Sequence, residues 1–339
     1  MLTSCTCNLI SFNHLLIVLK SAIDVLFATR GLSISRIRGQ GFDGASNMNR
    51  HISGLKSLIQ AENASAFYVH CFAHQLQLTL VAVSKKHDKI CSFFDHLASL
   101  VNFVGASCKR KELVLVKQIE KLAEEISQGN RMTGKGLNQE AVLKRPGDTR
   151  WGSHYHTILS VISLFSPALD VLEEIKDMPS FHENKGEIYR LIDAMNDFEF
   201  IFLLHLMRKV LGITNDLSQG LQRKDQDLAN ALCLVNVSKK MLQTFRDDGW
   251  NELIVDVSKF CEKFEIDVPD MDAISMPRGR SRRKLQKVSN KHHFKISLMN
   301  TIIDYQLQEI NERLDRDNME LLSCISCLNP QNSFLTFDK

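Results

Sequence analysis

The chain has few tyrosines and tryptophans, no long apolar run and little net charge. Its 339 residues include 4 Tyr and 2 Trp against 19 Phe, a balance typical of a packed helical interior rather than of a surface for stacking bases. No run approaches the roughly 18 apolar residues that a membrane span needs. The formal net charge of +3 does not by itself indicate a nucleic-acid partner, because local clustering of charge matters more than the total.

The chain also lacks the features of a secreted protein. Its nine cysteines are odd in number and unevenly spaced, which indicates reduced thiols rather than a disulfide framework. The apolar start is interrupted by Asn8, Asn13 and His14 and has no basic segment before it, so it is a poor signal peptide. We therefore expect a protein of the nucleus or cytoplasm that is not secreted.

Residues 1–20 differ from the sequence that follows. They carry no charge before Lys20 and show no clear period, so we set them apart as an atypical N-terminal segment. From residue 21 the apolar spacing becomes regular, and a short helix is predicted to end at Gly31.

Extended and helical patterns then alternate. Residues 33–38 predict a weak strand, and Ser46 is a good N-cap for an amphipathic helix. Residues 66–71 are aromatic and β-branched, as strands are, and the pattern after them is helical. We interpret residues 21–152 as one α/β region, in which residues 128–148 form an exposed loop rich in glycine and polar side chains.

The rest of the chain has mostly helical period. Residues 153–265 predict an all-helical domain inserted into the α/β region, and residues 266–294 an irregular, increasingly basic linker. Residues 295–339 predict a long amphipathic helix, to about residue 327, and a tail. The predicted fold class is α/β with mostly α content.

Asp43 is the first candidate site residue, because it lies in a glycine-flanked turn after a predicted strand. Gly41 and Gly44 would let a phosphate backbone approach closely. Metal-dependent phosphoryl transfer needs several carboxylates from separate elements around its metal ions, and no good partner for Asp43 is evident. The alternative is that Asp43 only forms an Asx-turn before the helix.

Cys71 and His74 form a Cys-x-x-His pair. The spacing is that of two zinc ligands, but a structural zinc site needs four. The alternative, a packed thiol beside a hydrogen-bonded imidazole, is the more frequent one, and we expect no metal site.

Arg150 and Trp151 open a predicted helix. Arginine binds phosphate with two parallel hydrogen bonds, and tryptophan stacks on a displaced base. The alternative is a tryptophan that anchors the loop to the core. The sequence leaves both open.

A dense basic segment follows Pro277. Its arginines and lysines create a local positive field that releases phosphate counterions, so they are candidate nucleic-acid contacts. A nuclear-import signal or a solvated loop are the alternatives. The residues are Arg278, Arg280, Arg282, Arg283, Lys284 and Lys287.

Five segments in one order, GQGFDGASNM, YVHCFAHQLQLTL, RPGDTRWGSHY, PRGRSRRKLQKV and LQEINERLDRDNMELL, resemble the hAT superfamily of cut-and-paste DNA transposases. They are most similar to its transposase-derived relatives of the zinc finger MYM-type protein 1-like and TTF-type zinc-finger groups. The similarity runs from about residue 21 to the end of the chain.

The resemblance implies an RNase H-like core that is interrupted by a large helical insertion and carries three metal-binding acids. Asp43 matches the second acid. Cys71 and His74 match a Cys-x-x-His element beside the active site. Arg150 and Trp151 match an Arg-Trp pair whose tryptophan is implicated in handling a flipped base or a hairpin end.

The chain departs from the family's pattern in its acids. The first acid belongs upstream of the similarity, where residues 1–20 contain none, and the third belongs beyond the segment NSFLTFDK. The resemblance thus implies a partial RNase H-like core truncated at both ends. Because one carboxylate does not fix two metal ions, we expect a catalytically inactive remnant without a cofactor.

Three functions remain open. The leading hypothesis is an inactive transposase-derived fragment that binds nucleic acid or protein. The second is a residual metal-dependent DNA nuclease, for which Mg²⁺ would be the cofactor. The third is a helical protein-interaction scaffold. The expected partners are DNA or a related transposase-like protein, with no membrane and no small-molecule substrate.

Overall fold

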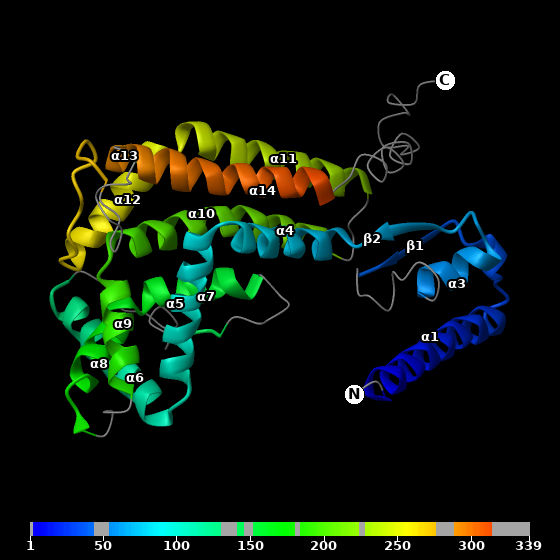
Figure 1. The fold of residues 1–339 in the computed structure, drawn as a ribbon, viewed down its shortest axis with the longest axis horizontal. Helices are drawn as coiled ribbons and strands as arrows, with labels where there is room; N and C mark the ends of the chain where they lie inside the picture. The colour runs from blue at the N-terminus through cyan, green and yellow to red at the C-terminus, as the bar shows by residue number, and fades with distance from the viewer. Residues whose placement is uncertain are drawn as a thin grey trace. The chain divides into compact units, whose positions relative to one another are not determined.

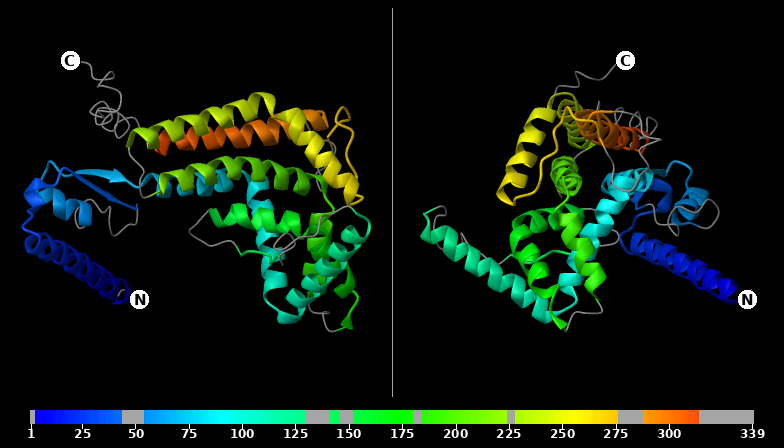
Figure 2. Two further views of the ribbon diagram at one scale, coloured as in Figure 1. Left: turned by 180° about the vertical axis from the view of Figure 1, so that it is seen from behind. Right: turned by 60° about the vertical axis from the view of Figure 1, so that its left-hand side comes forward.

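The chain forms two compact units in a computed structural model, residues 1–78 with 313–339 and residues 79–312. We name them the α/β unit and the helical unit and describe each by itself (Figures 1 and 2). The structure describes residues 3–43, 54–129, 141–145, 152–179, 184–223, 228–275 and 288–313.

This division differs from the predicted one. Residues 79–127 belong to the helical unit, although the sequence placed them in the α/β region of residues 21–152. The reason is their packing partners, since the helix of residues 88–105 packs on helices of residues 185–195 and 198–221. Periodicity predicts helices but does not assign them to a domain.

The α/β unit contains a parallel two-stranded sheet joined by a crossover helix. Gly39 lies opposite Phe67, and Phe42 opposite His70. A strand, helix, strand order of this kind is what residues 33–71 predicted, with the first strand further along the chain. The elements are α1 (Thr3–Thr29), the 3₁₀ helix η1 (Ile34–Arg36), β1 (Gly39–Phe42), α3 (Leu55–Glu62), β2 (Phe67–His70) and the start of α4 (Phe72–Lys86).

The weak strand predicted at residues 33–38 is wrong. The hydroxyl of Ser33 accepts a hydrogen bond from the backbone N–H of Ser35, which starts a 3₁₀ turn instead of an extended segment. The strand begins at Gly39, where a partner strand is in reach. The strand predicted at residues 66–71 is confirmed by β2.

α1 crosses the boundary that the sequence suggested at residue 20. The helix runs through that boundary and ends before Gly31, whose φ of +66° is the left-handed conformation predicted for it. Leu16 is buried, and Leu19, Ile23 and Phe27 pack against the same core. These positions recur every three or four residues, so one helical face packs on α3.

Lys20 lies on the buried face of α1 and is only 7% exposed. Its ammonium group lies 2.7 Å from Oδ1 of Asp24 and 2.7 Å from Oε1 of Glu62, the last residue of α3. Burial tends to lower the pKa of Lys20, but the hydrogen bonds to Asp24 and Glu62 raise it above its ordinary value. The ion pairs therefore join α1 to α3.

The helical unit is built around α10 (Phe198–Leu221). Phe198, Ile201, Phe202 and most of its other residues to Leu217 are buried, so α10 is the core helix of the unit. It packs on α5, α7, α9, α11 and α12. Other described helices of this unit are α5 (Asp88–Gly105), α6 (Cys108–Ser127), α7 (Gly152–Ser163), α8 (Phe165–Ile175), α9 (Lys185–Met195), α11 (Leu228–Asp248), α12 (Trp250–Lys263), α13 (Asn290–His292) and α14 (Thr301–Arg313).

The last helical segment begins earlier than predicted. α13 starts at Asn290, five residues inside the predicted linker, because the Ser289 hydroxyl caps it by accepting from the N–H of His292. A π-helical stretch, η4 (His293–Asn300), joins it to α14. The prediction of helix from 314 to 327 falls outside the described residues.

α14 is tied to the remainder of α4 by polar contacts. Lys86 Nζ lies 2.6 Å from Oε1 of Glu309, and the buried side-chain amide of Gln306 donates to the Thr79 hydroxyl at 3.3 Å. These contacts join residues more than 220 positions apart within the helical unit.

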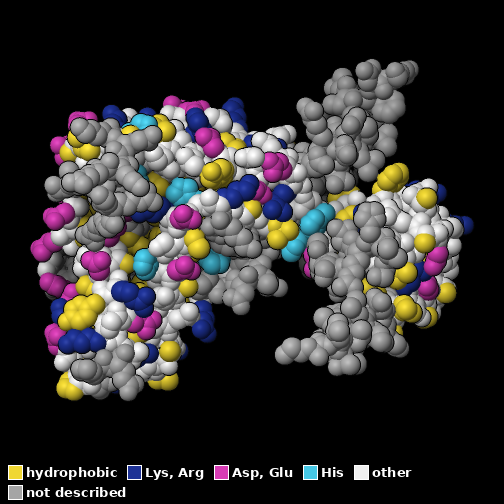
Figure 3. Space-filling model, in the orientation of Figure 1, with side chains coloured by type: hydrophobic (Ala, Val, Ile, Leu, Met, Phe, Trp, Pro, Cys, Tyr) yellow, Lys and Arg dark blue, Asp and Glu magenta, His cyan; other side chains and the backbone are white. Residues whose placement is uncertain are grey.

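Charges of both signs are mixed on the face of the helical unit that Figure 3 shows. In the part of the chain that is described, no single helix is long and apolar enough to cross a membrane. α5 and α6 are long and apolar enough when they are counted together, but the chain bends by 99° between them. This match rests on length and composition alone.

Candidate functional site

The carboxyl edge of the β1–β2 sheet brings Asp43 and Cys71 together. The two strands are parallel, so the residues that follow them emerge at the same edge. The backbone N–H of Cys71 donates to the carbonyl oxygen of Phe42 at 2.9 Å, which continues the ladder one step past the strands. The side chains of both Asp43 and Cys71 are exposed.

His74 lies beside this edge in the first turn of α4. Its ring is 5.3 Å from that of His70, the last residue of β2. Burial lowers the pKa of His70, and the nearby His74 lowers it further, while Asp43 opposes the shift. Nε2 of His70 is buried and has no hydrogen-bond partner among the described residues. His70 is therefore favoured as a neutral imidazole near neutral pH.

Tyr68 and His70 are site residues that the sequence reasoning missed. The Tyr68 hydroxyl lies 3.5 Å from the carbonyl oxygens of both Phe42 and Asp43, and Lys56 Nζ lies 4.8 Å from its ring centroid. Burial and then the carboxylate of Asp43 raise the pKa of Tyr68. The sequence signal for this pair is the alternation of a strand, which puts residues two apart, such as Tyr68 and His70, on one face. In the structure this face points toward Asp43.

The described residues at this edge do not form a two-metal centre. Among the described residues no three His, Cys, Asp or Glu side chains are grouped closely enough to hold a metal ion. Asp43 is a hard oxygen ligand of the type that Mg²⁺ prefers, and a phosphoryl-transfer centre needs further carboxylates beside it, which the described part of the chain does not group with Asp43. The structure thus places Asp43, Cys71 and His74 together without completing a metal site.

Arg150 and Trp151 lie outside the described residues, as do Arg278, Arg280, Arg282, Arg283, Lys284 and Lys287. The nearest described arginine before Trp151 is Arg145, whose Nε donates to Oδ1 of Asn102 on α5 at 2.7 Å. This contact fixes residues 141–145 on the helical unit.

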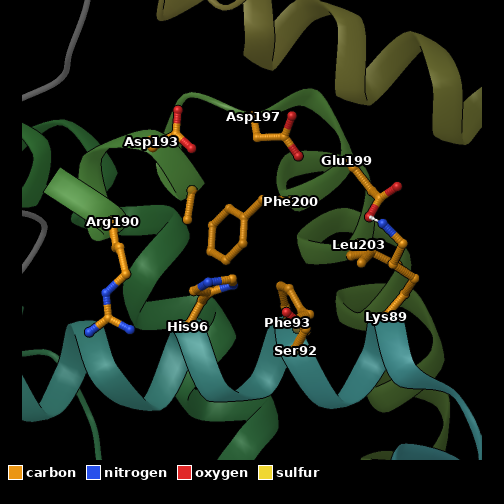
Figure 4. A pocket seen from close by; sticks show the side chains of 11 residues that line it. Lys89, Ser92, Phe93, His96, Arg190, Asp193, Asp197, Glu199, Phe200 and Leu203 are labelled. Carbon is orange, nitrogen blue, oxygen red and sulfur yellow. Dashed lines mark ion pairs between the residues drawn. The ribbon is translucent and has the colours of Figure 1, made fainter. Parts of the chain in front are cut away.

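A second polar site, which sequence reasoning did not find, lies between α5, α9 and the start of α10 (Figure 4). Lys89 and His96 come from α5, Arg190 and Asp193 from α9, and Asp197 and Glu199 from the beginning of α10. The first and last of these residues, Lys89 and Glu199, are more than 90 positions apart in the sequence. No local sequence motif therefore predicted the cluster.

Glu199 is the central residue of this polar cluster. Its Oε1 lies 2.6 Å from Lys89 Nζ, and its Oε2 lies 3.1 Å from Nε2 of His293. Burial tends to raise the pKa of Glu199, but the hydrogen bonds from His293 and Lys89 outweigh it and hold the pKa below its ordinary value. The carboxylate joins α5, α10 and η4 and is better explained as structural than as a catalytic acid.

Comparisons with known proteins agree with part of the resemblance. Residues 13–54 match the family model described as DUF4371: ZMYM1/FAM200, RNase-like domain. The match contains Asp43 and begins inside the segment of residues 1–20. The human protein named "52 kDa repressor of the inhibitor of the protein kinase" is 18% identical over 320 residues, which are 87% of this chain and 38% of that protein.

The chain therefore spans well under half the length of that relative. No solved structure matches the chain. The two sequence matches support a relationship to the ZMYM-like, transposase-derived proteins.

Proposed function

We propose that the chain is part of an hAT-type transposase-derived protein that binds nucleic acid in the nucleus or cytoplasm and does not itself cut it. The match to an RNase-like domain over residues 13–54 supports the origin. The β1–α3–β2 unit, with Asp43 after its first strand, is the arrangement in which an RNase H-like core would hold that acid.

The observation that carries the inactive assignment is the environment of Asp43. Cleavage by in-line displacement needs metal ions held by several carboxylates. The described residues near Asp43 supply Tyr68, His70, Cys71 and His74 instead, and no metal-holding group of three forms among them. Mg²⁺ prefers several carboxylate oxygens, and among the described residues Asp43 is accompanied by phenol, imidazole and thiol groups, which supports the proposal of an inactive site.

A nicking assay tests this assignment. The chain is incubated with supercoiled plasmid and Mg²⁺ or Mn²⁺ beside two variants, Asp43→Asn and Asp95→Asn, the latter an exposed acid on α5 that serves as the matched control. We expect no nicking above buffer with any of the three. Nicking that Asp43→Asn abolishes and Asp95→Asn preserves would establish the nuclease instead.

Nucleic-acid binding is tested by salt titration. Replacing Arg278, Arg280, Arg282, Arg283, Lys284 and Lys287 by glutamine should weaken DNA binding and flatten its dependence on salt, because fewer counterions are released. Absence of binding by the unmodified chain, even at low salt, would contradict the proposal.

A helical protein-interaction scaffold is the second candidate, favoured by the outer face of α1. Val18 and Val25 (60%) are exposed opposite its buried face, and Ile17 (62%) and Leu26 are exposed on its two flanks. Exposed apolar side chains that surround the outer side of a helix are typical of a protein contact. Failure of DNA binding together with self-association that Val25→Lys abolishes would favour this function.

A further inference from the structure

A pocket in the helical unit has the composition of a binding site for an anion with an apolar body. It lies between α6, the junction of α7 and α8, and the end of α12, and its volume is about 360 Å³. This is within the range of small-molecule sites, roughly 300–1,000 Å³. Leu122, Ile162, Pro167 and Phe260 supply its apolar wall.

Two lysines converge on one ring of this pocket. Nζ of Lys121, from α6, lies 5.4 Å from the ring centroid of Phe264, and Nζ of Lys263, the last residue of α12, lies 5.6 Å from it. Both distances are within the roughly 6 Å of a cation–π contact. Phe264 packs in turn on Phe165 and Phe260, so the ring that holds the two ammonium groups is fixed by the core.

Two carboxylates of α8 are paired with other lysines. On α8, Glu174 pairs with Lys117 at 3.2 Å and Glu173 pairs with Lys176. In the ion pairs formed between described residues, neither Lys121 nor Lys263 takes part. The pocket is lined by these two ammonium groups and one carboxylate, Glu125, so it carries an excess of positive charge.

We propose that this pocket binds a nucleotide, with the phosphate between Lys121 and Lys263 and the base against the apolar wall formed by Pro167 and Phe260. A phosphate dianion is attracted to both ammonium groups, each of which lies within 6 Å of the centroid of the Phe264 ring. The exposed hydroxyl of Ser163 and the side-chain amide of Gln118 are further polar groups at the pocket. The site is independent of the basic segment after Pro277 and goes beyond the proposed function.

The nucleotide has two possible sources, a free nucleotide and a unit of single-stranded nucleic acid. The probe is a fluorescently labelled pentamer of deoxyadenylate, followed by anisotropy. Unlabelled pentamer, AMP and inorganic phosphate are the competitors. All proteins carry the six glutamine replacements in the basic segment, so that this segment does not contribute to the signal.

The decisive variants change two charges at a time. Lys121→Gln with Lys263→Gln removes both amines of the pocket, and Lys111→Gln with Lys259→Gln removes two exposed amines from the same helices, outside it. We expect the pocket variant to bind the pentamer at least tenfold more weakly, and the control to stay within twofold of the parent. The salt slope should fall by about 0.7, because the proposed site neutralises one phosphate of a single strand.

The competitors then decide the source. Displacement by AMP at concentrations near those of the pentamer supports a free nucleotide, and displacement by the pentamer alone supports a strand. Equal competition by inorganic phosphate and AMP would overturn the nucleotide assignment, because the base would contribute nothing. Equal affinity of the pocket and control variants, or no binding by the parent, would overturn the site. Circular dichroism of both variants verifies that they are folded.

Discussion

The backbone N–H of Cys71 donates to the carbonyl oxygen of Phe42, and this 2.9 Å hydrogen bond places Asp43 and Cys71 next to each other at the end of the sheet. The two residues are 28 positions apart in the sequence. Their meeting follows from the parallel pairing of β1 and β2, because the carboxyl ends of parallel strands share an edge. The contact shows that the turn at Asp43 and the Cys71-x-x-His74 pair, which are separate in the sequence, lie at the same edge of the sheet.

Lys20→Met should weaken the contact of α1 with α3. The ion pairs raise the pKa of Lys20, so their contribution to stability is complete below about pH 10.5 and is lost as the pH rises through the higher pKa of the folded state. Urea unfolding at pH 8 should show the wild type more stable than Lys20→Met, and the difference should shrink above pH 11.

The partners Asp24 and Glu62 are half-exposed, so the coupling should be modest. A double-mutant cycle of Lys20→Met with Glu62→Gln should give about 0.5–1 kcal/mol. A coupling of zero would show that Lys20 is held by burial of its aliphatic stem alone.

Glu199→Gln should destabilise the helical unit by about 2–3 kcal/mol at pH 7, because Lys89 and His293 lose their shared anion in a site where Glu199 is only 23% exposed. The pKa of Glu199 is lowered in the folded state, so its contribution is present above its ordinary pKa and is lost as the pH falls through the lowered value.

Denaturant midpoints at pH 7 and pH 3 measure this effect, and the difference between wild type and variant should be smaller at pH 3. Glu252→Gln is the control, since Glu252 pairs with Lys209 on the exposed surface and should leave stability nearly unchanged. Equal effects of the two variants would contradict a structural role for Glu199.

His205→Leu should remove an acid-sensitive position from the core. Burial lowers the pKa of His205 to about 4, and its Nε2 has no hydrogen-bond partner among the described residues. The unfolded state therefore binds more protons between about pH 6.5 and 4, and stability falls through that range as the pH drops.

The variant should be more stable than wild type at pH 5, and the gain should be smaller at pH 7. Thermal unfolding at the two pH values tests this. Loss of the edge-to-face contact of His205 with Phe260, whose ring centroids lie 4.9 Å apart, reduces the gain at both values equally. A gain independent of pH would exclude the lowered pKa as its cause.

Cys261 should resist alkylation in the folded protein. Its thiol is buried on α12, and burial raises its pKa to about 11, so the reactive thiolate is scarce at pH 8. Cys233 on α11 is exposed and serves as the internal control. Iodoacetamide labelling followed by peptide mass spectrometry should show Cys233 modified at least tenfold faster than Cys261, and similar rates after unfolding in urea. Equal rates in the folded state would contradict the packing of α12.

The sequence by itself determined the local parts of this protein. The spacing around Gly31 predicted the end of α1, the composition of residues 66–71 predicted β2, and the order of strand, helix and strand followed from both. These features depend on backbone preferences and on the period of apolar side chains, which neighbouring residues fix. The mostly helical content after residue 72 was predictable for the same reason.

Only the tertiary structure decided which distant side chains meet. Residues 1–20 lack charge before Lys20, and only the packing of Leu16 and Lys20 on α3 shows which of their apolar positions face a core. The cluster at Glu199 and the two lysines at Phe264 each join elements more than 90 positions apart. Such contacts depend on how helices pack, and periodicity shows that a face is buried without showing what buries it.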